Sequence, residues 1–87
     1  DVYKRQPFNP STTITFELPR DARVDLSIYD VRGGHVRTVA GGLLAAGHRE
    51  ARWDGRDEAG NAVNSGVYFC RLTACDRTLT RKLVLLR

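Results

Sequence analysis

Two cysteines are the residues of this 87-residue chain with the most reactive side chains, and they stand five positions apart. Within the chain Cys70 and Cys75 can pair only with each other, and the loop so closed is too short to stabilise much. Two thiols without a second pair of ligands are also too few donors for a structural metal. We therefore interpret Cys70 as a small buried apolar residue and Cys75 as a turn residue, and we expect no cofactor.

An acidic loop is the best candidate for a small ligand. It runs from residue 54 to 61 and supplies hard oxygens of the kind that Ca²⁺ prefers, from Asp54, Asp57, Glu58 and Asn61. The spacing does not fit an EF-hand, and Arg56 places a positive charge in the middle. Since Asp and Asn also hold tight turns through bonds to their own backbone, turn formation is the favoured interpretation and calcium binding the weaker alternative.

The two histidines give no sign of catalysis. His35 and His48 lie in different segments beside glycine-rich turns, with no serine or cysteine motif arranged around them. A catalytic triad is defined by geometry, so the spacing alone does not settle the matter. The prediction is that the chain is not an enzyme and has no catalytic residues.

Positive charge raises the question of an anionic partner. The formal net charge is +4, and of the fourteen basic residues only Lys4 and Lys82 are lysines. Arginines such as Arg23, Arg37 and Arg71 alternate with acidic residues, whereas nucleic-acid binders concentrate positive charge and interleave aromatic side chains. A solvated face of mixed sign is favoured, and a basic nucleic-acid-binding module remains the alternative from another functional class.

The elements that must position these residues are strands. Apolar and polar residues alternate with a period of two, which is typical of strands with one buried face. Strands are expected at residues 14–18, 24–28, 35–40, 48–53, 66–74 and 78–86, with a short one at 62–63 and one helical turn at 43–46. Turn residues separate them, and no apolar run is long enough to span a membrane. The pattern predicts one all-β domain, an antiparallel β-sandwich of about seven strands.

Five motifs along the chain resemble those of a known family. They are Pro7-Phe8-Asn9-Pro10-Ser11-Thr12-Thr13-Ile14, Tyr29-Asp30-Val31-Arg32-Gly33, Trp53-Asp54-Gly55-Arg56-Asp57, Ser65-Gly66-Val67-Tyr68-Phe69 and Arg81-Lys82-Leu83-Val84. Their order and spacing are similar to those of the FlgD-type Ig-like domains, related to the flagellar hook-capping protein and found at the C-termini of secreted bacterial proteins. Arg49 and Ala51 depart from that pattern in the fourth strand. The type IX secretion C-terminal sorting domain is a more distant likeness.

The resemblance implies an Ig-like sandwich over residues 7–87. The six residues before it fit nothing that follows, and we interpret residues 1–6 as a non-native scar or a linker. We expect Phe16, Ile28, Trp53, Tyr68 and Leu72 to form its core. By resemblance the chain is a non-catalytic C-terminal accessory domain of a larger exported bacterial protein, at the cell surface or outside the cell. It would act in sorting, anchoring or spacing, with the parent protein, export machinery or cell-surface components as partners. Export machinery would read the strand that contains Lys82, Leu83 and Val84, and a structural domain of a hook-capping protein is the alternative.

Overall fold

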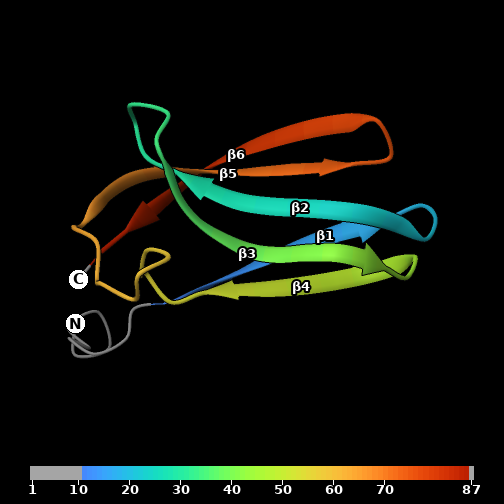
Figure 1. The fold of residues 1–87 in the computed structure, drawn as a ribbon, viewed down its shortest axis with the longest axis horizontal. Coiled ribbons are helices and arrows are strands. Elements are labelled where there is room, and N and C mark those ends of the chain that lie inside the picture. Colours follow the sequence, from blue (N-terminus) through green and yellow to red (C-terminus); the bar gives the residue numbers. More distant parts are fainter. Residues whose placement is uncertain (1–10, 87) are drawn as a thin grey trace.

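The computed structural model describes residues 11–86, which form six antiparallel strands in two sheets (Figure 1). One sheet has two strands in the order β1–β4, and the other has four in the order β3–β2–β5–β6. The bounds are β1 Thr12–Leu18, β2 Ala22–Tyr29, β3 His35–Leu44, β4 Gly47–Trp53, β5 Gly66–Ala74 and β6 Arg77–Leu85. This is the all-β sandwich that the alternating pattern predicts, with six strands among the described residues where about seven were expected.

The core lies between the two sheets, and the period of two decides which residues enter it. In β1 and β2 alternate apolar side chains face inward, and most of the intervening polar residues face solvent. Ser27 is the exception, because it is buried and donates a hydrogen bond to Asp25. The buried apolar residues come from all six strands, and the most enclosed are Trp53, Leu26 and Ile28. Such a layer of side chains between two packed sheets is the stabilising centre of a β-sandwich.

Two predicted details of the secondary structure are wrong. The strand expected to end at residue 40 continues to Leu44, because the backbone of Gly42 pairs with Val24 and Leu44 pairs with Ala22. A helical turn at 43–46 therefore does not form. At residues 62–63 only an isolated bridge between Ala62 and Arg56 is present, so that segment adds no seventh strand.

The turns explain why the motifs need their particular residues. The Oδ1 atom of Asp30 accepts backbone hydrogen bonds from Arg32 at 2.9 Å and from Gly34 at 2.8 Å. A side chain at Gly34 would bring a Cβ atom within 3.0 Å of the Asp30 carboxylate, so glycine suits that position. The β5–β6 hairpin turns on Cys75 and Asp76, with φ of 52° and 61°, the left-handed conformation that two-residue hairpin turns of type I′ require.

No helix in the described part of the chain is suited to cross a membrane.

Candidate functional site

Trp53 and Tyr68 anchor the two ends of the connection between β4 and β5, residues 54–65, which contains the acidic loop. Their rings meet edge to face at a centroid distance of 5.2 Å, and both are buried. The indole N–H of Trp53 donates to the carbonyl oxygen of Arg56 at 2.9 Å. The hydroxyl of Tyr68 donates to the carbonyl oxygen of Asn64 at 2.6 Å, a bond back to the preceding backbone like that of the tyrosine corner in Ig-type sandwiches. The β4–β5 connection is thus tied to the core where it begins and where it ends.

Four of the five residues expected in the core are buried. Phe16, Ile28, Trp53 and Tyr68 lie between the sheets, whereas Leu72 is only half-buried. Leu72 lies on β5 beside an opening between the two sheets, and Leu79 faces it from β6. The two-stranded sheet leaves this part of the four-stranded sheet uncovered.

The two departures from the family pattern occur where β4 pairs with β1. Arg49 and Ala51 are both half-buried, opposite Phe16 and Ile14 respectively. Strand β4 nevertheless pairs with β1 over seven residues. Smaller or charged side chains at these positions leave the strand pairing intact.

The oxygens of the acidic loop are engaged in turns. The Oδ1 atom of Asp57 accepts the backbone N–H groups of Ala59 at 3.0 Å and Asn61 at 2.9 Å. The Oδ1 atom of Asp54 accepts the backbone N–H of Arg56 at 3.2 Å. Residues 11–86 hold no group of three acidic, histidine or cysteine side chains arranged around a common metal position. The geometry favours turn formation over calcium binding.

Glu58 attaches the same loop to the outer edge of β3. Its backbone N–H donates to the carbonyl of Val36 at 3.0 Å, and its side-chain Oε2 accepts the N–H of Thr38 at 2.8 Å. The guanidinium of Arg37 donates to the carbonyl of Asp57 at 3.0 Å. Unpaired edges invite association with other chains, so this loop protects β3. The sequence contains no signal of this contact, because the partners are twenty residues or more apart.

Replacing Asp57 by alanine is expected to destabilise the domain by about 1 kcal/mol, because two backbone amides lose their acceptor. Urea unfolding of the purified chain measures this change. Asn61→Ala is the matched control, since Asn61 contributes its backbone amide to the turn and its exposed side chain is removed at little cost.

Calcium is expected to have no effect on the stability of this loop. With the oxygens held in turns, adding calcium chloride should leave the melting temperature unchanged. A melting temperature that rises with calcium, and no longer does so in Asp57→Ala, would identify a cation site instead.

The two histidines have separate surroundings. The Nδ1 atom of His48 lies 2.7 Å from Oε2 of Glu17 on β1, and its Nε2 atom lies 3.6 Å from Oε2 of Glu50. His35 is 3.0 Å from the hydroxyl of Thr38, and its ring packs edge to face on Tyr29. Neither histidine has a serine or cysteine among these contacts, and the hydroxyl beside His35 belongs to Thr38.

The hydrogen bond to Glu17 raises the pKa of His48 above its ordinary value, with a smaller contribution from Glu50, while desolvation opposes the shift. A pKa raised on folding stabilises the domain fully below the unfolded value of about 6.5, and this contribution is lost as the pH rises through the folded pKa. Because the pair is exposed, its effect on stability is small.

We expect Glu17→Gln to return the pKa of His48 toward its ordinary value, since the charge that favours the imidazolium is removed. A proton NMR titration of the His48 ring measures this. Glu50→Gln, at the longer distance, should lower the pKa less. An equal or absent shift in Glu17→Gln would show that the contact does not persist in solution.

The thiols are both free. Cys70 is buried, and burial raises the pKa of its thiol, while the positive charge of Arg81 opposes that increase. Cys75 occupies the β5–β6 turn. A raised pKa disfavours the reactive thiolate at Cys70, which suits a packing role.

The strand expected to be read by export machinery is β6. Lys82 and Val84 are exposed on its outer face, and Leu83 is half-buried opposite Tyr68. Within residues 11–86 β6 pairs only with β5, so its other edge has no partner strand. It is therefore an accessible strand at the side of the domain (Figure 1).

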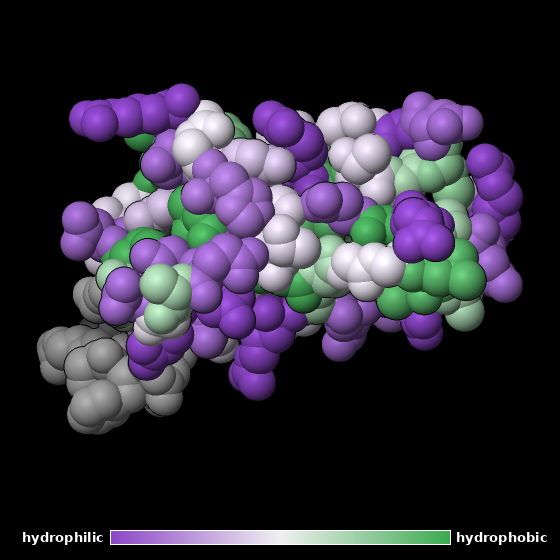
Figure 2. Space-filling model, viewed as in Figure 1, coloured by the Kyte–Doolittle hydropathy of each residue, from purple (hydrophilic) through white to green (hydrophobic). Residues whose placement is uncertain are grey.

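Polar side chains are spread over the visible face of the domain. Figure 2 shows hydrophilic side chains interspersed with apolar ones across the visible face. One arginine, Arg71, places its guanidinium carbon 4.3 Å from the centre of the Tyr29 ring. The alternation of arginines with acidic residues in the sequence is typical of a solvated sheet face.

The chain is similar to known proteins of one family. A family model, the FlgD Ig-like domain, matches residues 4–77. The structure is similar to FlgD from Pseudomonas aeruginosa, with a TM-score of 0.63, 27% identity and 86% of this chain covered, and to FlgD from Xanthomonas campestris, with a TM-score of 0.68, 27% identity and 88% covered. The match spans 59% and 56% of those two chains, and the Xanthomonas campestris protein is described in terms of hook capping essential for flagellar assembly. No curated protein matches the sequence. The order of the motifs, the sandwich that they form and the family match together show that this chain belongs to the FlgD Ig-like domain family.

Proposed function

We propose that this chain is a non-catalytic structural domain of an exported, hook-capping-type bacterial protein, acting outside the cell as a folded part of a longer polypeptide. The likeness to two FlgD structures, one of them from a protein described in terms of hook capping essential for flagellar assembly, carries this proposal. The motif residues Trp53 and Asp57 form structural hydrogen bonds in the core and in a turn, which supports a structural role for the domain. The partner is the remainder of the parent protein.

The role fits what the sandwich can do physically. A domain with its loop attached at Trp53, Glu58 and Tyr68 presents a fixed shape to its neighbours. Fixed shape is what a spacer or an assembly subunit requires, since little ordering entropy is then lost on association. No bound cofactor is needed for such a role.

A domain-exchange experiment tests this proposal. The Ig-like domain of the Xanthomonas campestris FlgD is replaced by residues 7–87 of this chain in a strain that lacks its own gene. Assembly of hooks and recovery of swimming motility are expected if the domain acts as a structural unit. A matched chimera that carries Trp53→Ala should fail because the domain no longer folds stably.

Secretion of the chimera without hook assembly would overturn the proposal, provided that the exchanged domain is folded. Folding is checked by resistance of the secreted chimera to proteolysis. The amount of chimera in the medium is measured in parallel, so that a failure of secretion is distinguished from a failure of hook assembly.

A second candidate function is sorting, and the accessible strand β6 favours it. The family match ends at residue 77, so most of β6 lies beyond the matched segment. In this proposal export machinery or a surface component recognises Lys82, Leu83 and Val84. Lys82 and Val84 are the exposed members of the strand.

The double substitution Lys82→Glu with Val84→Thr distinguishes the two functions. Both side chains are exposed, so the domain should remain folded. Loss of the full-length protein from the medium, with an unchanged melting temperature, would support sorting. Normal secretion would exclude it and leave the structural role.

A further inference from the structure

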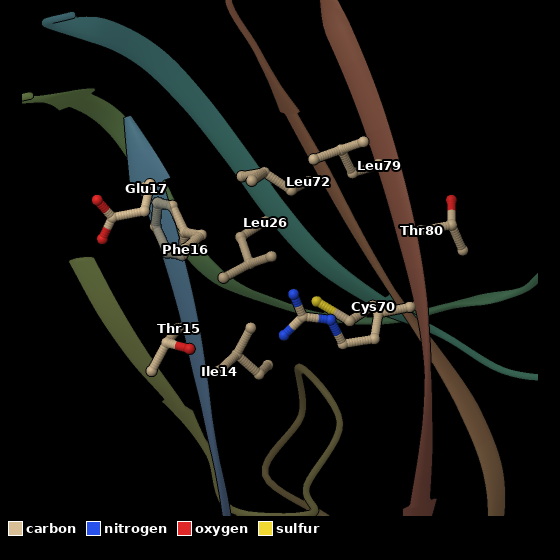
Figure 3. A pocket seen from close by; sticks show the side chains of 10 residues that line it. Ile14, Thr15, Phe16, Glu17, Leu26, Cys70, Leu72, Leu79 and Thr80 are labelled. Atoms are coloured by element: carbon tan, nitrogen blue, oxygen red, sulfur yellow. The ribbon is translucent and has the colours of Figure 1, made fainter. Parts of the chain in front are cut away.

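An apolar groove of about 390 Å³ lies between the two sheets, beside β1 of the narrow sheet and β6 of the wide sheet (Figure 3). Strand β1 forms one wall with Ile14 and Phe16, and strand β6 forms the other with Leu79 and Thr80. Leu26 and Cys70 lie between these walls, on the four-stranded sheet. The groove is therefore continuous with the core.

The groove exists because the two sheets differ in width. Within residues 11–86, β1 pairs with β4 on one edge only, and β6 pairs with β5 on one edge only. The two-stranded sheet cannot cover all four strands of the other. Leu72 is left half-buried and Leu79 58% exposed, although the register places both on the inner face.

Two cations of β6, Arg77 and Arg81, lie on this inner face, and Arg81 is the one that lines the groove. In the register of the β5–β6 hairpin, Arg81 pairs with the buried Cys70, so its side chain leaves the sheet on the same side as that thiol. Arg81 and Cys70 both line the groove. Among the described residues Arg81 has no ion-pair partner, whereas Glu17, the acidic residue in the groove, is occupied by His48 at 2.7 Å.

From these features we infer that the groove binds an extended peptide segment that pairs with the free edge of β1 and carries an acidic side chain opposite Arg81. The backbone N–H and C=O groups of the β1 edge supply the hydrogen bonds of strand addition. Alternate side chains of the segment enter the groove, because successive residues of a strand point to opposite faces. Apolar groups then cover Phe16, Leu72 and Leu79.

The edge of β1 is the favoured position for two reasons. A strand beside β1 lies over β5 and β6 and widens the narrow sheet to three strands, which covers the exposed apolar side chains. A strand beside β6 would extend the wide sheet further and leave Leu72 and Leu79 in water. An inward-pointing charge on β6 also discourages an apolar strand from pairing there, as it does on protected edges elsewhere.

The acidic residue provides the specificity. An apolar segment alone would leave the charge of Arg81 partly desolvated and unpaired, which is unfavourable. A carboxylate at the central inward position gives Arg81 a charge-assisted hydrogen bond. A lysine at that position adds repulsion instead, so the groove discriminates by charge as well as by shape.

Three acetylated and amidated heptapeptides test the inference: TVTDTVT, TVTNTVT and TVTKTVT. Each reads identically in both directions, so its inward face is the same in parallel or antiparallel pairing. The whole chain, labelled with ¹⁵N, is titrated with each peptide and followed by NMR. We expect shifts of the β1 backbone amides, and binding of the aspartate peptide about fivefold tighter than the asparagine peptide.

Substitutions at Arg81 and Leu79 provide the matched tests. Arg81→Glu should reverse the preference so that the lysine peptide binds best, and Arg81→Gln should abolish the discrimination. Leu79→Ser should weaken all three peptides by a similar factor. Both side chains are exposed, so these variants are expected to fold, and circular dichroism verifies this.

The inference is overturned by any of three results. The aspartate and lysine peptides could bind equally, the shifts could be confined to the outer face of the four-stranded sheet, or no peptide could shift the β1 amides at millimolar concentration. A peptide with N-methylated backbone amides serves as a further control. If it binds as well as its parent, the interaction is not strand addition.

Discussion

Replacing Trp53 by alanine is expected to destabilise the domain by about 3–5 kcal/mol. The indole is 1% exposed, packs edge to face on Tyr68 and donates its N–H to the Arg56 carbonyl. Its removal leaves a cavity at the point where β4 ends and the acidic loop begins. A small domain has a total stability of only about 5–15 kcal/mol, so a large fraction of it would be lost. Urea unfolding monitored by circular dichroism measures the change.

Tyr68→Phe is the matched control for Trp53→Ala. It keeps the ring contact and removes only the hydroxyl that donates to the Asn64 carbonyl. The expected cost is about 1 kcal/mol. If Trp53→Ala costs no more than Tyr68→Phe, Trp53 does not occupy the central position that the structure gives it.

Replacing Leu26 by alanine is the second large effect, with an expected destabilisation of about 2–5 kcal/mol. Leu26 lies in the central strand β2 and is 1% exposed between neighbours on β3 and β5. Because strands surround it on both sides, the site cannot collapse to fill the space. The free energy of unfolding, measured in urea, gives the magnitude.

Leu43→Ala removes the same atoms from an exposed position. Leu43 lies on β3 and is 72% exposed, so the expected change is within about 0.5 kcal/mol. Equal costs at the two positions would contradict the assignment of inner and outer faces. A large cost at Leu43 alone would show that its surface is covered in solution.

Much of the strand pattern was accessible from the sequence, because side-chain alternation is a local property. Residues 14–18 and 24–28 show it clearly, and their strands, β1 and β2, contain those segments. The interpretation was wrong at Gly41 and Gly42, where glycines suggested the end of a strand. Pairing with Val24 and Asp25 on β2 carries the strand through both glycines, and such long-range pairing is invisible in a local pattern.

The contacts of the candidate sites were predictable from the sequence only where they join residues close together in the chain. The turn role of Asp57 was accessible, since an Asx turn involves residues two to four positions apart. The attachment of Glu58 to β3 was not, because it depends on how the loop folds back over the sheet. The inward direction of Arg81 was accessible in principle, as it continues the alternation of Leu79 and Leu83 in β6.

The sequence by itself determined the class of fold, most of the turns and the family, because each depends on residue types at short spacing. Only the tertiary structure decided that two strands face four, that Leu72 is left half-covered, and that Arg81 lies at an open groove. The physical reason is that the width of each sheet depends on which distant strands pair. Strand pairing is a property of the whole chain, and it leaves no local pattern in the residues that line the groove.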